Sequence, residues 1–228
     1  MFKVESVGVG GAPPVAVLRS RYDVAFVFVV KQSQLAKFKL DSLLPRIVGF
    51  VPFKVVPVHG ETLGSLQTLQ LARSHIDATA PLLLCTCSNV TQWLPGTSVD
   101  DMIDTPAAAA VETVQSNDSN NLYVKTTSHQ DASIVTEIHK KLPISNQACT
   151  GLYFWRSAAD FFKAAEATLS PNKNSHQPSY TIPMAYNDGD ILMVRAGLVA
   201  GPATKKGRKM AMLLRQPVAG TATIKTTA

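Results

Sequence analysis

The sequence lacks an apolar run long enough to cross a bilayer as a helix. The longest candidate, Val24–Val30, ends at Lys31, whereas a membrane-spanning helix requires about 20 residues. The first residues, Met1–Pro14, lack the apolar block of a secretion signal and contain too little arginine for an organelle presequence. We therefore expect an intracellular protein without a transmembrane segment, in the cytoplasm or in an organelle such as the mitochondrion.

Residues that bind metals or act as nucleophiles are few and scattered. Cys85, Cys87 and Cys149 form no metal-ligand pattern. Cys85 and Cys87 lie in an apolar run and would share one sheet face, which favours buried apolar roles. The five histidines show no HxH or HxxxH spacing, and no Gly-x-Ser-x-Gly sequence occurs. The sequence predicts no metal site, no cofactor and no hydrolase triad.

The composition favours one globular α/β domain, with 228 residues, 46% of them hydrophobic and 17% charged. The net charge is +6, and no acidic residue follows Asp190. A segment whose charged residues are all basic can bind nucleic acid, an anionic membrane face or an acidic protein. The alternative is a solvated terminus without a partner. We predict that the basic residues of this segment bind a partner, namely Arg195, Lys205, Lys206, Arg208, Lys209 and Arg215.

Strand and helix patterns alternate in the first part of the chain. This order predicts a mainly parallel sheet covered by helices. The expected strands are Val24–Val30, Phe53–Val58 and Pro81–Cys87. The expected helices are 34–39, 40–47 and a helix that Thr62 caps and that continues to about His75.

The sequence pattern of the second part of the chain indicates further strands and two more helices. Beyond Gly197 the sequence is typical of loop and tail. We expect an N-terminal arm (1–21), one domain (22–196) and a basic C-terminal extension (197–228). The strands are expected at 111–115, 122–127, 134–138, 152–155 and 191–194, and the helices at 100–110 and, capped by Ser157, at 158–169.

A stretch near the middle of the chain resembles the sugar-1-phosphate nucleotidyltransferases. It runs Thr-Gly-Leu-Tyr-Phe-Trp-Arg-Ser-Ala-Ala-Asp from Thr150 to Asp160, after Val135-Thr-Glu-Ile138 and Pro143-Ile-Ser-Asn146. Members of this family make nucleotide sugars from a nucleoside triphosphate and a sugar phosphate. The resemblance spans about 22–214 and implies a nucleotidyltransferase (GT-A-like) fold. It also implies a vestigial nucleotide and sugar pocket at Gly64, Thr150 and Gly151.

The chain departs from this family at the phosphate-binding loop. The family has a glycine-rich loop that ends in Thr-Arg, whose N–H groups bind the triphosphate. Here Gly8, Gly10 and Gly11 are followed by Ala-Pro-Pro, and proline has no N–H to donate. The strand at Val24 then follows too soon for a helix to intervene. The chain is therefore expected to lack most of the first βα unit.

The metal-binding aspartates of the family are also missing. The first falls at Ser88, next to Asn89, and the second falls near Arg195, whose charge repels Mg²⁺. In addition, Leu66 is expected to crowd the nucleobase. Phosphoryl transfer relies on positioning and charge neutralisation, so the sequence predicts no catalytic residue and leans toward a protein that is not an enzyme.

Three functions remain open at this point. The first is an inactive structural or interaction subunit, docked through its termini onto proteins of a larger complex, with nucleic acid a further partner for the basic tail. The second is an active nucleotidyltransferase with a rebuilt site, which requires Lys31 or Lys54 near the phosphates and one of four aspartates on the metal. These aspartates are Asp100, Asp101, Asp188 and Asp190. The third is a nucleotide- or sugar-binding regulatory module without turnover.

Overall fold

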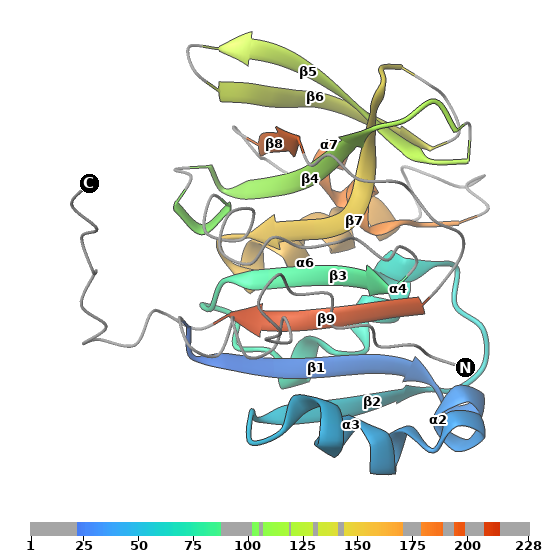
Figure 1. Cartoon of the computed structure of the whole chain (residues 1–228). Coiled ribbons are helices and arrows are strands. Elements are labelled where there is room, and N and C mark those ends of the chain that lie inside the picture. Colours follow the sequence, from blue (N-terminus) through green and yellow to red (C-terminus); the bar gives the residue numbers. More distant parts are fainter. Residues whose placement is uncertain are drawn as a thin grey trace.

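In the computed structural model of the chain, nine strands form one mixed sheet with helices on both faces (Figure 1). The structure describes residues 22–87, 102–104, 107–118, 120–129, 132–140, 144–170, 179–188, 194–198 and 208–214. The strands are β1 (Val24–Lys31), β2 (Phe53–Val58), β3 (Leu82–Cys87), β4 (Ala109–Gln115), β5 (Leu122–His129), β6 (Ala132–Lys140), β7 (Gln147–Trp155), β8 (Val194–Leu198) and β9 (Arg208–Leu214). The helices are α2 (Gln32–Phe38), α3 (Leu40–Val48), α4 (Ser65–Gln70), α6 (Ala158–Leu169) and α7 (Ala185–Asp188), with 3₁₀ turns η1 (Arg73–His75) and η2 (Ile182–Met184).

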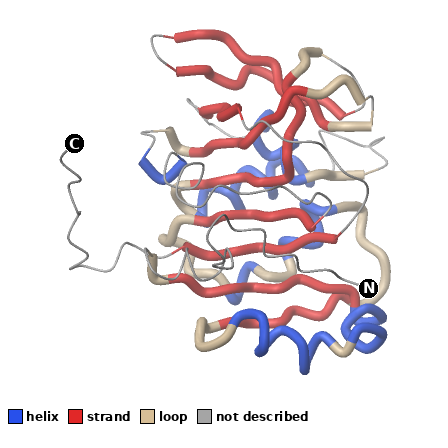
Figure 2. The backbone as a smooth tube through the Cα atoms, viewed as in Figure 1, coloured by secondary structure: helices blue, strands red, loops and turns tan. Residues whose placement is uncertain are grey.

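The strand order is β2-β1-β9-β3-β7-β4-β8-β6-β5, with a further pairing of β7 to β5 (Figures 1 and 2). The predicted α/β class is confirmed, but the prediction of a mainly parallel sheet is wrong. Among the described strands only β1–β2 and β4–β8 pair in parallel. The expectation failed because it followed the βαβ pattern of the first strands alone, whereas β7 and β9 run against their neighbours.

The C-terminal strand β9 lies in the middle of the sheet, between β1 and β3. It pairs antiparallel with both, so that Met212 lies opposite Phe26 on one side and Leu83 on the other. Because both neighbours oppose β9, β1 and β3 share one direction, as the sequence pattern predicts. The expectation of loop and tail beyond Gly197 is therefore wrong for 208–214. Its apolar run Met-Ala-Met-Leu-Leu suits a buried strand.

Other elements test the remaining boundaries. The strand Phe53–Val58 and the helix over 158–169 have the predicted bounds, and the side chain of Ser157 accepts from the Asp160 N–H as a helix cap does. The helix predicted over 100–110 is wrong in its second half: of the described residues in this range 102–104 are helical, 107–108 are not, and β4 already begins at Ala109.

Alternating side chains of β1 separate two cores. Val27 and Val29 belong to the core that α4 and α6 cover, and Phe26 and Phe28 belong to the core on the side of α3. In the view of Figure 1, α4, α6 and α7 lie behind the sheet and α2 and α3 in front. None of the described helices has the length and hydropathy to cross a bilayer. The sheet is thus covered on both faces, and its strand ends carry the candidate site.

We predict that Met212→Pro lowers the free energy of unfolding by about 3 kcal/mol or more, because proline removes an N–H from the ladder of a central strand. Met212→Val keeps the N–H and a strand-forming side chain. Urea denaturation followed by circular dichroism checks this. Equal stability of the proline and valine variants would contradict the central position of β9.

Candidate functional site

Gly64 precedes α4 on the chain segment that follows β2. It has φ 140° and ψ −171°, a conformation that favours glycine. The predicted cap by Thr62 is wrong, because no side chain caps α4. The Thr62 hydroxyl instead lies 2.7 Å from the Thr68 hydroxyl and 3.3 Å from the Gly64 carbonyl oxygen. The helix also ends earlier than predicted, at Gln70.

The backbone of Tyr180 occupies the space beside Gly64. A Cβ on Gly64 would lie 2.2 Å from the Tyr180 carbonyl oxygen. The Leu66 N–H donates to that oxygen over 3.1 Å, and the Tyr180 N–H donates to the Leu63 carbonyl oxygen over 2.7 Å. Packing within the chain therefore accounts for a glycine at this position without any nucleotide.

Leu66 does not project toward a ligand. Its side chain is fully buried in the core under α4, so the expectation that it crowds a nucleobase is wrong. Sequence order gives the position of a residue along a helix, whereas the face on which it lies depends on the rotation of the helix about its axis. The exposed leucines of this segment are Leu63, just before the helix, and Leu71, just after it.

Thr150 and Gly151 lie on β7, beside the carboxyl end of β3. Gly151 has φ 102°, and a Cβ there would lie 2.1 Å from the Thr86 hydroxyl oxygen. The register of β7 against β4 shifts at the same level, between Val111 and Thr113, as in a β-bulge. This glycine, too, is required by a contact within the chain.

A buried carboxyl group completes this region. The Thr150 hydroxyl donates to Glu112 over 2.5 Å, and both residues are buried. Sequence reasoning missed Glu112. The available signal was a single acidic residue inside the otherwise uncharged strand Ala109–Gln115, since carboxyl groups are seldom buried without a polar partner.

Gly64, Thr86 and Gly151 lie at the edge of the sheet where β2 and β3 end. β2 and β3 share one direction, because β2 is parallel to β1 and β9 opposes both β1 and β3. In open α/β sheets ligands bind outside the carboxyl ends of the strands. The structure thus brings the predicted pocket residues to the expected edge, and it fills the space at both glycines with the chain's own atoms.

The described residues do not fit a magnesium site. No three histidine, cysteine, aspartate or glutamate side chains among them are grouped as metal ligands. Lys31 is held by Glu61, with its ammonium nitrogen 2.7 and 2.8 Å from the two carboxylate oxygens. Lys54 is exposed on β2. The backbone of Asp188 ends α7, while the positions 88–89, 100–101 and 190 lie outside the described residues.

The predicted partner-binding residues do not form one continuous tail. Arg195 lies on β8, opposite Ala110 of β4. Arg208 and Lys209 begin β9, opposite Cys87 and Thr86 at the carboxyl end of β3. Lys205, Lys206 and Arg215 lie outside the described residues. Arg208 and Lys209 lie at the start of β9, so the length of this strand lies between them and the residues that follow Leu214.

Cys149 lies in a buried aromatic cluster rather than in a reactive site. Burial raises the pKa of its thiol to about 12, and burial likewise raises the pKa of Tyr153 and of Tyr186. The Tyr186 hydroxyl lies 3.0 Å from the Ala110 carbonyl oxygen, and its ring lies 4.9 Å from that of Trp155. Trp155 is thus a packing residue of this cluster.

The two other cysteines were predicted to be buried apolar residues. Cys85 is half-buried and packs at the margin of the core on the α3 side. The side chain of Cys87 lies outside the described residues.

Comparison with known proteins shows the fold. The structure is similar to a nucleoside-diphosphate-sugar pyrophosphorylase from Vibrio cholerae RC9, with a TM-score of 0.66 and 18% identity over 86% of this chain and 83% of the other. It is also similar to a UDP-glucose pyrophosphorylase (TM-score 0.56, 14% identity, 90% and 83% covered). An inositol-1-phosphate CTP transferase from T. maritima gives a TM-score of 0.57 at 14% identity, with 83% and 79% covered.

No family model and no curated protein matches the sequence. The predicted nucleotidyltransferase fold is therefore confirmed from structure, at identities that establish the fold alone.

We predict that Gly64→Ala lowers the free energy of unfolding by roughly 3 kcal/mol, because the added Cβ meets backbone atoms and the backbone is strained. Gly60 is the matched control. It also has a positive φ, of 74°, but has no atom near its missing Cβ, so Gly60→Ala should cost about 1 kcal/mol. Thermal unfolding measures both. A Gly64→Ala variant of undiminished stability would contradict the close contact with the Tyr180 backbone as the reason for this glycine.

We predict that Cys149 resists alkylation at pH 8 in the folded protein. The thiolate is the nucleophile, and a pKa of about 12 keeps the thiol protonated until the pH approaches that value. Iodoacetamide labelling, mapped by mass spectrometry with and without denaturant, should modify Cys149 only after unfolding and Cys85 earlier. Rapid labelling of Cys149 in the native protein would be incompatible with its burial.

Proposed function

We propose that this chain is a catalytically inactive, N-terminally truncated relative of the sugar-1-phosphate nucleotidyltransferases. In this proposal it serves as a structural or interaction subunit of a larger assembly. The observation that carries the proposal is the position of β9. In doubly wound sheets the first strand lies between the second and the fourth, and the turn after it binds phosphates at a helix N-terminus. Here β9 holds that position between β1 and β3.

The direction of β9 is incompatible with such a phosphate site. Because β9 is antiparallel to β1 and β3, it begins, rather than ends, at the edge where they end. A strand that starts at this edge cannot lead into a helix whose N-terminus points at a phosphate there. The central strand position is therefore retained for the sheet, and the βα turn that the chemistry needs is not formed by it.

The two matching glycines support the same proposal. Gly64 faces the backbone of Tyr180, and Gly151 faces the Thr86 side chain. Both are explained by the fold, so their presence does not require a bound nucleotide or sugar. The described residues keep the fold but contain no grouped set of metal ligands. This combination is typical of a protein that acts through its shape rather than through catalysis.

The strand ends indicate how the termini reach a partner. Val24, the first residue of β1, lies opposite Leu214, the last residue of β9. The start of β1, which follows the arm 1–21, and the end of β9, which precedes 215–228, therefore lie next to each other. Both lie at the edge of the sheet opposite the candidate pocket. In this proposal both terminal segments dock there, and Arg215 is one of the contact residues, while Arg195, Arg208 and Lys209 contact the partner from the sheet.

The active-enzyme alternative is favoured by one observation, the buried Glu112 beside Thr150, which supplies a carboxyl group close to the predicted sugar side. Against it stands Lys31, whose charge is compensated by Glu61. That alternative also requires Asp100, Asp101, Asp188 or Asp190 to bind the metal. Direct measurement of nucleotide binding and turnover separates the two functions.

We predict that Mg²⁺–UTP, –CTP and –TTP produce no saturable heat in isothermal titration of the full-length protein, because the loop and the metal carboxylates that bind a triphosphate are missing. Incubation with glucose 1-phosphate should yield no pyrophosphate. Micromolar binding without turnover would identify a regulatory module. Turnover abolished by Asp→Asn at the four named positions would identify a rebuilt enzyme.

A further inference from the structure

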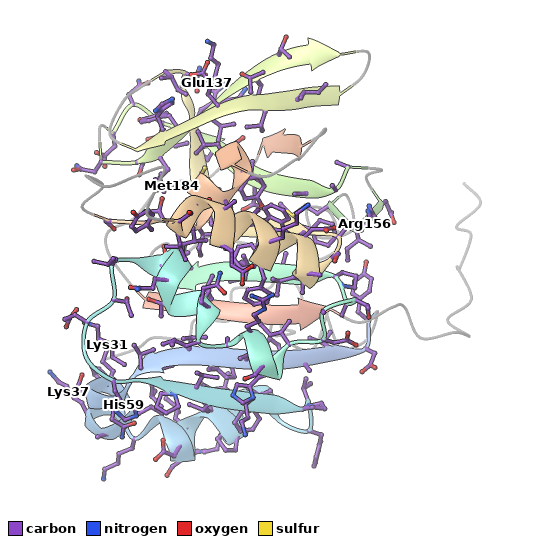
Figure 3. All side chains as sticks on the ribbon, turned by 180° about the vertical axis from the view of Figure 1, so that it is seen from behind. Lys31, Lys37, His59, Glu137, Arg156 and Met184 are labelled. Atoms are coloured by element: carbon purple, nitrogen blue, oxygen red, sulfur yellow. The ribbon has the colours of Figure 1, made fainter. Side chains whose placement is uncertain are left out.

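One layer at the edge of the sheet concentrates the positive charge of the described residues. We call the segment from Lys31 to His59 the basic edge layer; it comprises α2, α3, β2 and their turns. It holds five of the nine lysines and arginines whose side chains are described, but one carboxylate, Asp41. Two carboxylates flank the layer, Asp23 and Glu61. In Figure 3, Lys31, Lys37 and His59 mark one corner of it.

Two cations elsewhere in the described structure are paired with carboxylates. Arg73 forms an ion pair with Glu166, and the Lys125 ammonium lies 3.1 Å from a Glu137 carboxylate oxygen. Arg156 keeps its charge, but its guanidinium is held by hydrogen bonds to two backbone carbonyl oxygens. These three side chains are therefore engaged within the chain.

Four cations of the basic edge layer are not compensated in this way. Lys31 is held by Glu61. Lys37, Lys39, Arg46 and Lys54 are all exposed, and no ion pair joins them to another described residue. Lys37 and Arg46 lie in the last turns of α2 and α3, where a cation complements the helix dipole yet keeps its full charge toward solvent. The layer thus presents four uncompensated charges at one edge.

An exposed aromatic side chain lies in the same layer, at the end where β2 begins. Phe50, in the turn between α3 and β2, is 99% exposed. The side chains of Phe26, Phe28 and Phe53 pack in the core on the side of α3. The ring of Phe50 is not part of this core. Arg46 precedes it by four residues and Lys54 follows it by four. Basic groups around an exposed ring match the phosphates and base faces of a single strand of nucleic acid.

The same edge is unsuited to a protein partner that adds a β-strand. β2 is the outermost strand on this side of the sheet. Within β2, Pro57 lacks an N–H, and Lys54 places an exposed positive charge on the strand. Both features disfavour the addition of a further strand. From the charge, the exposed ring and the protected edge, we infer that the basic edge layer binds single-stranded nucleic acid, with its cations on phosphates and Phe50 stacked on a base.

We test this with the full-length protein and a fluorescein-labelled oligouridylate of about 12 nucleotides, by fluorescence anisotropy at several KCl concentrations between about 50 and 200 mM. Lys39→Gln/Arg46→Gln/Lys54→Gln should weaken binding at least tenfold at the lowest salt. It should also reduce the slope of log K against log salt by about 2, since each phosphate contact in a single strand contributes about 0.7.

The matched control, Arg73→Gln/Lys125→Gln/Lys163→Gln, removes the same charge from other surfaces and should bind within about twofold of the unchanged protein. Phe50→Ala should weaken binding about tenfold at every salt concentration without changing the slope. Phe50→Trp should retain binding and give a fluorescence signal that the oligonucleotide quenches. Circular dichroism confirms that each variant is folded.

Equal losses in the two triple variants would overturn the inference, because binding would then follow net charge alone. Poly-L-glutamate that competes as well as the oligonucleotide, with no effect of Phe50→Ala, would instead identify an acidic protein as the partner of this layer. The substituted residues of this test are not residues of the candidate pocket. Failure of the test therefore leaves the nucleotide titrations unaffected, and turnover in those titrations would overturn the proposed function without touching this surface.

Discussion

β1 and β3 run in the same direction with room for one strand between them, and that position has to be filled. Buried backbone N–H and C=O groups require partners, and an open gap in the middle of a sheet would leave those of two strands without any. The chain fills the gap with β9, which pairs with both neighbours. The cores on the two faces, the shared direction of β1, β2 and β3, and the meeting of Val24 with Leu214 all depend on this insertion.

The insertion also changes what the sheet can do. A parallel strand at this position would deliver a turn and a helix N-terminus to the edge where phosphates bind, whereas an antiparallel strand only enters there. The fold of the nucleotidyltransferases is therefore present, while β9 does not supply the βα turn of a phosphate site. The close contacts at Gly64 and Gly151 show why matching residues are a weak indicator of activity, since a packing requirement and a ligand both select glycine.

Charge on the described surface follows a similar division. Lys125 of β5 is paired with Glu137 of β6, and Arg73 of η1 is paired with Glu166 of α6, while four cations of the basic edge layer have no such pair among the described residues. Surface ion pairs contribute little to stability, so uncompensated lysines cost the fold almost nothing and remain available for long-range attraction of an anionic partner.

The sequence alone determined the elements whose signals are local. The apolar run of β1, the strand Phe53–Val58 and the Ser157-capped helix were predictable because each depends on neighbouring residues, through periodicity or a single cap. The tertiary structure alone decided the rest. β9 was unpredictable because its partners lie more than 120 residues away along the chain. The Gly64–Tyr180 contact and the Thr150–Glu112 hydrogen bond also join residues that are not neighbours in the sequence. Such pairings form only when distant parts of the chain come together in the sheet. They determine which strand, carboxyl group or cation lies at each edge of the sheet.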